Sequence, residues 1–149
     1  MGTKWSSAPS KMQTIEEKTF YHSGLAEVVV PGNIRTIGDY AFNNCANLKN
    51  VIIMNGTQSI GSLAFYSCDN LEYIHLPDSV EIIRAEAFMD CVSLQEFDYP
   101  MNWTEATFDW SNYDLFRGCE SLTEVTVPEG VAVMPNGAFA GSDCLENAT

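Results

Sequence analysis

The feature that most constrains this chain is an internal repeat with a period of about 23 residues. This length is typical of the repeats that stack into solenoids. The segment "IGDYAFNNCANLKNVII" begins at Ile37, and it is followed by "IGSLAFYSCDNLEYIHL" from Ile60 and "IRAEAFMDCVSLQEFDY" from Ile83. A unit of this length cannot bury its own apolar side chains and does so only against its neighbours. The sequence therefore predicts an array of stacked repeats.

Several positions recur in register when the repeats are aligned on phenylalanine. The recurring phenylalanines are evenly spaced except for one longer interval between the fourth and the fifth: Phe20, Phe42, Phe65, Phe88, Phe116 and Phe139. Alternating aliphatic residues follow in each repeat, which is the period of a short strand with one buried face, and proline ends four of these strands. We expect each unit to be a strand, a corner, a short extended piece and a turn, with the phenylalanine rings stacked in one column.

Four of the five cysteines occupy one repeated position, three residues after the phenylalanine: Cys45, Cys68, Cys91 and Cys119. Stacked rungs lie about 4.8 Å apart, whereas a disulfide needs Cβ atoms nearer to about 3.8 Å. We therefore expect a ladder of buried free thiols, with Cys144 as the thiol most exposed to solvent. Cysteines in a single column cannot converge tetrahedrally, so no metal site is expected there.

The net charge of −13 is concentrated in the second part of the chain, where residues 51–149 carry two basic groups against sixteen acids. Such a surface repels phosphate backbones and anionic headgroups, so nucleic acid is a poor candidate partner. A basic protein patch or a cation remains compatible, although the acids could simply keep a solenoid soluble. No apolar run approaches the roughly 20 residues of a membrane span, so no membrane insertion is expected, and no signal peptide is evident at the start.

The unit "LEYIHLPDSVEIIRAEAFMDC" resembles the repeat of the BspA-like leucine-rich repeat family, and the match covers residues 14–145. The family's units run Leu-x-x-Ile-x-Leu-Pro, then Val-x-x-Ile-Gly, then Ala-Phe-x-x-Cys. The resemblance implies a right-handed repeat solenoid with a concave parallel β-sheet and short helical or irregular turns on the other side. It also implies a cell-surface or secreted location and a role in adhesion or protein binding. Arg84 and Pro135 depart from the pattern by replacing the glycine of Gly38 and Gly61.

The expected domain organisation is an N-terminal leader at residues 1–13, followed by a single solenoid at 14–149. The solenoid holds about five to six copies of the repeat, with an insertion at 101–115 that breaks the period. Leu145 should precede a strand, but only "ENAT" follows it. Solenoids need caps on their terminal rungs, so we expect a fragment of a longer array or self-association through uncapped ends.

The outward positions of the strands form two expected surface columns. If Val51 and Ile53 point inward, one outward column is Glu27, Asn50, Tyr73, Glu96 and Glu124, and the other is Val29, Ile52, His75, Asp98 and Thr126. Neighbours in a column lie about 5 Å apart. Because solenoids bind through their concave sheets, the candidate partner-binding residues are Tyr73, His75, Glu96, Asp98 and Glu124. The alternative is that these are ordinary solvated strand positions.

The insertion adds two candidate residues, Trp103 and Trp110. Aromatic rings beside hydrogen-bonding side chains suit a sugar or a protein partner. An inserted loop must also cover its own rung, so we expect at least one tryptophan to pack inside.

His75 beside Asp98 would suit general-base chemistry, because a carboxylate can orient an imidazole. No serine or cysteine is expected beside His75, and Thr126 lies on the far side of Asp98. We therefore expect no catalytic residues, no enzyme activity, no cofactor and no metal. The sequence predicts a non-catalytic binding or adhesion module for a protein or glycan partner. The alternative is a structural spacer within a longer surface protein.

Overall fold

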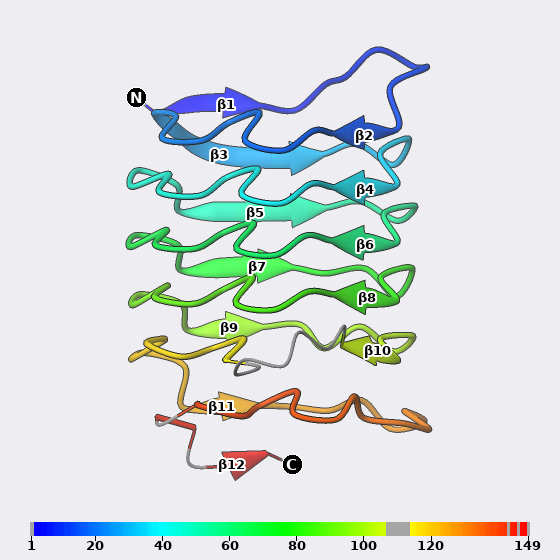
Figure 1. Cartoon of the computed structure of the whole chain (residues 1–149), viewed down its shortest axis with the longest axis vertical. Helices are drawn as coiled ribbons and strands as arrows, with labels where there is room; N and C mark the ends of the chain where they lie inside the picture. The colour runs from blue at the N-terminus through cyan, green and yellow to red at the C-terminus, as the bar shows by residue number, and fades with distance from the viewer. Residues whose placement is uncertain (1, 107–113, 143, 146, 149) are drawn as a thin grey trace.

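The computed structural model describes residues 2–106, 114–142, 144–145 and 147–148, and it is a coil whose rungs stack along one axis (Figure 1). The described residues contain strands and turns but no helix. One side of the coil is a five-stranded parallel sheet, called here the long sheet. Its strands in order are β1 (Thr3–Trp5), β3 (Leu25–Val30), β5 (Asn50–Ile53), β7 (Tyr73–His75) and β9 (Glu96–Phe97).

A second parallel sheet of very short strands forms on the return path of each rung (Figure 1). It contains β2 (Thr14–Ile15), β4 (Thr36–Ile37), β6 (Ser59–Ile60), β8 (Ile82–Ile83) and β10 (Glu105–Ala106). A separate pair follows, formed by β11 (Glu124–Val125) and β12 (Asn147–Ala148). The expected fold class, a repeat solenoid with a parallel sheet, is confirmed. Short helical or irregular turns were expected on the side opposite the sheet, and the described residues form turns there and no helix.

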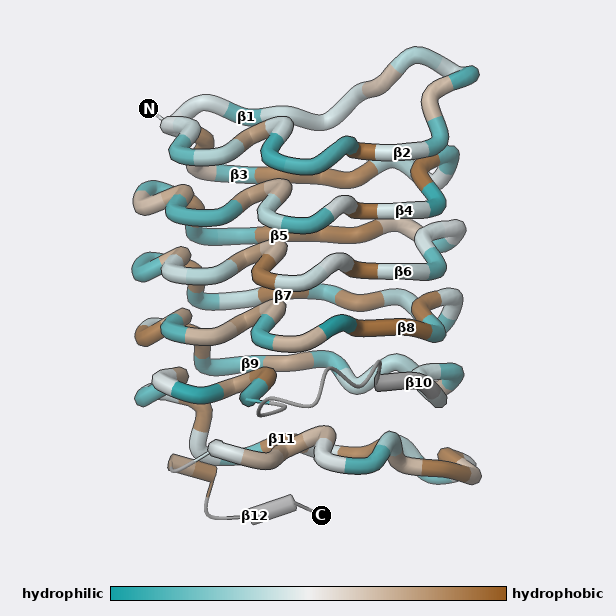
Figure 2. The backbone as a smooth tube through the Cα atoms, viewed as in Figure 1, coloured by the Kyte–Doolittle hydropathy of each residue, from teal (hydrophilic) through white to brown (hydrophobic). Residues whose placement is uncertain are grey.

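The register of the long sheet follows the sequence repeat. Val28 pairs with Val51 and Val51 with Ile74, so equivalent positions lie beside one another on successive rungs. β5 reads exposed, buried, exposed, buried, as the alternation of its apolar residues requires. Figure 2 shows apolar stretches that recur at equivalent places along successive rungs. The inward residues therefore form one continuous core.

The phenylalanines form the expected column. Ring centroids are 5.0 Å apart for Phe20 and Phe42, 5.1 Å for Phe42 and Phe65, and 5.6 Å for Phe65 and Phe88. The same stacking continues through Phe116 to Phe139. Burial contributes about 2 kcal/mol to stability for each buried ring of the column, whereas Phe20 and Phe139 at its two ends are only partly buried.

The thiol ladder is also confirmed, because the four cysteines of the repeat are free and buried. Each sulfur donates a hydrogen bond to the phenylalanine carbonyl oxygen of the preceding rung, for example from Cys68 to Phe42 at 3.2 Å and from Cys91 to Phe65 at 3.1 Å. Burial raises the pKa of Cys68 well above its ordinary value. Cys144, expected to be the most exposed thiol, is half-buried.

The turns depend on residues in the left-handed region of backbone conformation. One column of such residues is His22, Asn44, Ser67 and Asp90, and Gly118 and Gly141 continue it at the same repeat position. Gly61 meets a different requirement, since a Cβ there would lie 2.5 Å from the backbone nitrogen of Asp39. Glycine at this corner thus permits close approach of two rungs.

Strands also form where the sequence pattern did not place them. β1 lies within the expected leader and pairs with β3, so the long sheet begins before residue 14. β10 lies inside the insertion and pairs with β8. β12 lies within "ENAT", where no strand was expected, and pairs with β11. That last expectation was wrong, because pairing of the backbone does not require apolar alternation when the partner strand supplies the hydrogen bonds.

Candidate binding groove on the long sheet

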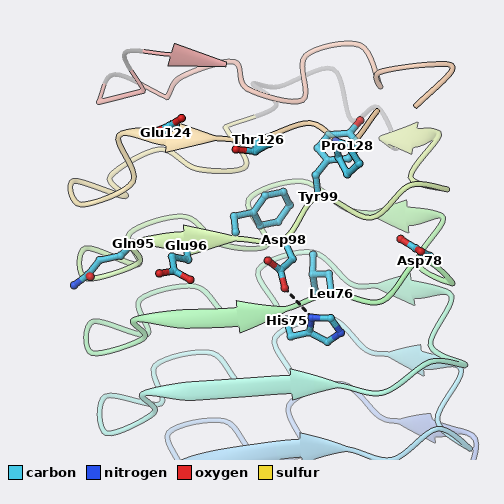
Figure 3. A pocket seen from close by; sticks show the side chains of 11 residues that line it. His75, Leu76, Asp78, Gln95, Glu96, Asp98, Tyr99, Glu124, Thr126 and Pro128 are labelled. Carbon is cyan, nitrogen blue, oxygen red and sulfur yellow. Dashed lines mark hydrogen bonds and ion pairs between the residues drawn. The ribbon is translucent and has the colours of Figure 1, made fainter. Parts of the chain in front are cut away.

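A groove opens on the long sheet where its hydrogen-bonded ladder ends. β9 is the last strand of that sheet, and in the described residues β11 pairs with β12 instead of β9. The space between the two strands has a volume of about 500 Å³. Figure 3 shows it with Glu96 and Asp98 on one side and with Glu124 and Thr126 on the other. The interruption coincides with the one long interval between successive phenylalanines of the repeat.

Asp98 is the centre of a hydrogen-bonded cluster beside the groove. Its Oδ2 atom accepts a hydrogen bond from the Tyr73 hydroxyl group at 3.0 Å and lies 2.7 Å from Nδ1 of His75. An ionised carboxylate only accepts hydrogen bonds, so Nδ1 of His75 carries a proton in this contact. The side chains of His75 and Asp98 are 42% and 45% exposed, so a partner can reach both.

The Tyr73 hydroxyl group is held as a proton donor in this cluster. Burial, followed by the neighbouring Asp98 carboxylate, raises the pKa of Tyr73 above its ordinary value. The hydroxyl therefore stays protonated through the neutral range and continues to donate to Asp98. This bond fixes one carboxylate lone pair and leaves the second oxygen, Oδ1, for another partner.

The groove combines an apolar floor with an acidic rim. Leu76 and Phe97 are nearly buried and form part of the floor, together with Pro128, whereas the nearly buried Tyr99 forms part of one wall. The rim carries four carboxylates, from Asp78, Glu96, Asp98 and Glu124. No serine or cysteine is among the described residues that line the groove, whereas Thr126 and Tyr99, which carry hydroxyl groups, belong to its lining.

Tyr99 has an unsatisfied polar atom in the groove wall. The residue is only 4% exposed, and its hydroxyl group has no hydrogen-bond partner among the described residues. Figure 3 shows Tyr99 reaching from the end of β9 toward Pro128 on the next rung. A buried polar group without a partner is uncommon, and Trp103 and Ser142, which do not line the groove, each carry another such atom.

The structure brings most of the sequence-predicted residues together. His75, Glu96, Asp98 and Glu124 line the groove, and Tyr73 joins them through Asp98. Tyr73 and Glu96 pair directly across β7 and β9, as the expected surface column requires. Glu124 departs from that expectation, because it pairs with Asn147 and faces Glu96 across the groove.

The insertion residues fall outside this site. Trp103 is fully buried and packs against Tyr99 and Phe97, at centroid distances of 5.3 and 6.3 Å. Its ring belongs to the core, because the connection after β9 folds inward and covers its own rung. The prediction that Trp103 contacts a partner is therefore wrong. Trp110 lies outside the described residues. No group of three potential metal ligands occurs in the part of the chain that is described.

Sequence reasoning did not anticipate Tyr99 and Pro128 as groove residues. Tyr99 occupies the repeat position that holds Val30, Ile53 and Leu76 in earlier rungs, so the pattern predicted an ordinary core side chain there. The one available signal in the sequence was the long interval between the fourth and fifth phenylalanines. It indicates that the chain follows a different course between these two rungs than between the others.

Comparisons with known proteins agree with this architecture. The chain matches the T. pallidum leucine rich repeat protein (TpLRR) with 26% identity and a TM-score of 0.77, over 99% of this chain and 69% of that one. A leucine rich cell surface protein from Faecalibacterium prausnitzii matches with 26% identity and a TM-score of 0.65, over 92% of this chain and 42% of that one.

A leucine-rich repeat protein from Eubacterium ventriosum matches with 25% identity and a TM-score of 0.69, over 91% of this chain and 36% of that one. The chain thus spans less than half the length of the last two structures. A comparison with curated proteins finds no match.

The stacked rungs, the parallel long sheet and the turns between them define a leucine-rich repeat protein. The family model described as BspA type leucine rich repeat region matches residues 13–146 in six copies. The chain belongs to this BspA-type family. Among the described residues, none forms a helix of the length and apolar character that a membrane span requires.

Proposed function

We propose that this chain is a binding or adhesion module that presents the outer face of its long sheet, and the groove beside β9, to a protein or glycan partner. The observation that carries the proposal is the groove itself, where the ladder stops and the exposed His75–Asp98 pair lies beside an acidic rim. If the strand surface had no partner, the ladder of the long sheet would not need to stop at β9. Ile52 supports the proposal, since it is a large apolar side chain 43% exposed on the same face.

The resemblance to the leucine rich cell surface protein from Faecalibacterium prausnitzii supports a location on or outside the cell. We include that location in the proposal, because adhesion requires the sheet to face the surroundings. The clustered acids make a basic protein surface a better partner than nucleic acid.

Replacing Tyr73, His75 and Asp98 together with alanine tests the proposed surface. Capture of ligands from a panel of matrix proteins and polysaccharides should be lost, while the thermal unfolding midpoint stays unchanged because the three side chains point outward. A control that replaces Glu17, Tyr21 and His22 with alanine removes the same chemical groups from an exposed turn of the coil. Equal capture by both variants would contradict the proposed surface and favour the spacer role.

A further inference from the structure

We propose that the groove between β9 and β11 binds an extended segment of a partner protein through an arginine or lysine side chain. This inference rests on the binding role proposed above and adds the chemistry of the ligand. The groove is lined by described residues of β9 and β11 and of the segments that follow β7, β9 and β11 (Figure 3), and the His75 and Asp98 side chains in its lining are exposed to solvent.

The shape of the groove matches a long cationic side chain. Such a side chain has an apolar stem and a charged head, and it buries the stem while the head stays near solvent. Here the floor is formed by Leu76, Phe97 and Pro128, whereas the carboxylates of Glu96 and Glu124 stand at the rim. The stem would contact the floor and the head would contact the rim.

Charge complementarity favours a cation over other ligands. Four carboxylates and one histidine line the groove, and no lysine or arginine is among the described lining residues to neutralise them. Asp98 already uses Oδ2 for Tyr73 and His75, so its other carboxylate oxygen is available to a guanidinium or ammonium group. Charge-assisted hydrogen bonds of this kind are among the strongest in proteins.

The Tyr99 hydroxyl group is one of three buried polar atoms without a partner in the described residues, and of the three residues only Tyr99 lines the groove. This group is buried in the wall and has no partner in the described part of the chain. A hydroxyl oxygen accepts hydrogen bonds as well as donating them, so a donor-rich guanidinium or ammonium group is a fitting partner. The same wall carries no free basic group to meet an anion among its described residues.

Two other ligand classes fit less well. A sugar needs the flat face of an aromatic ring, but Phe97 and Tyr99 are 6% and 4% exposed and offer no such face. A metal ion needs several ligands around one point, and no group of three is found in the described ranges. A protein segment that carries arginine or lysine therefore fits the groove best.

Selection from a phage-displayed library of random heptapeptides tests the inference. Bound peptides should be enriched in arginine or lysine at one position by at least about tenfold, since loss of a close charge partner costs several kcal/mol. When the Asp98→Asn/Glu124→Gln variant is the target of the selection, the enrichment of arginine or lysine should be abolished. A control variant, Glu81→Gln/Glu120→Gln, removes the same charge from exposed sites outside the groove and should retain it.

Titration of one selected peptide completes the test. Replacing its arginine or lysine with citrulline or norleucine should weaken binding by at least about tenfold, and added salt should also weaken it. The inference is overturned if no cationic residue is enriched, or if both double variants lose the enrichment equally. Binding of a glycan panel that requires Tyr73, His75 and Asp98 would also overturn it, yet would leave the proposed binding role intact. If neither peptides nor glycans bind, both proposals fail.

Discussion

The sulfur of Cys68 donates a hydrogen bond to the carbonyl oxygen of Phe42, one rung earlier, at 3.2 Å. The same relationship joins Cys45 to Phe20, Cys91 to Phe65 and Cys119 to Phe88. Each cysteine thus fills a small buried volume and also donates a hydrogen bond to a carbonyl oxygen of the preceding rung, which accepts a backbone N–H as well. This dual role explains a thiol at the position better than apolar burial alone.

Replacing Cys68 with alanine should lower the free energy of unfolding by about 1–3 kcal/mol, because it removes both buried volume and a hydrogen bond. Urea unfolding followed by circular dichroism measures the change. Cys144→Ala is the control, since that thiol is only half-buried and should change stability less. Equal losses in the two variants would contradict the structural role of the ladder.

Stability should decline in alkaline solution because of the buried thiols. Burial raises the pKa of Cys119 to about 12 and that of Cys68 well above its ordinary value. Below about pH 8.5 both the folded and the unfolded states keep these protons, so the contribution to stability is fully present. Above that pH only the unfolded state loses them, and the free energy of unfolding should fall by about 1.4 kcal/mol per pH unit for each thiol.

Urea unfolding of the parent and of Cys68→Ala between pH 7 and pH 10 isolates this effect from other titrating groups. The variant should show a shallower decline, because it lacks one of the thiols that ionise only after unfolding. Parallel pH profiles for the two proteins would show that the thiol is not held protonated by the fold.

Replacing Gly61 with alanine should destabilise the coil by about 1–3 kcal/mol, because the added Cβ would meet the backbone of the preceding rung. Gly24→Ala provides the matched control, since a Cβ there has no atom within 4 Å. Thermal or urea unfolding compares the two variants. A loss in Gly24→Ala as large as that in Gly61→Ala would argue against close packing at the corner.

Replacing Ser67 with glycine should raise stability by up to about 1 kcal/mol, because Ser67 is held at φ 53°, where an L side chain is strained. Gly118 and Gly141 already occupy this repeat position in later rungs. Ser62→Gly is the same chemical change in the same repeat at an ordinary φ, and it should lower stability by about 0.5–1 kcal/mol. Urea unfolding of both variants should therefore give changes of opposite sign.

The core of this protein is readable from its sequence because the repeat is regular. Phe42, Phe65 and Phe88 are evenly spaced along the chain, and equivalent residues of successive rungs must then lie beside one another. The same regularity predicts the outward column of Tyr73 and Glu96. Periodicity therefore determines both the buried and the exposed faces as long as the period holds.

The groove could not be predicted in the same way, because it arises where the period fails. The extra residues between Phe88 and Phe116 do not reveal whether β11 continues the ladder of β9 or leaves it. Tyr99 similarly occupies a core position by pattern, but its longer side chain places a hydroxyl group in the groove wall. Such features depend on the path of one irregular rung.

Hydrogen exchange with and without a selected cationic peptide tests most directly whether the interruption of the long sheet is the binding surface. The account predicts slower exchange of backbone amides in 95–99 and 124–128, on the two edges of the groove, and unchanged exchange in the turn at 38–46. Protection of that turn at saturating peptide, with no protection at the two groove edges, would contradict it.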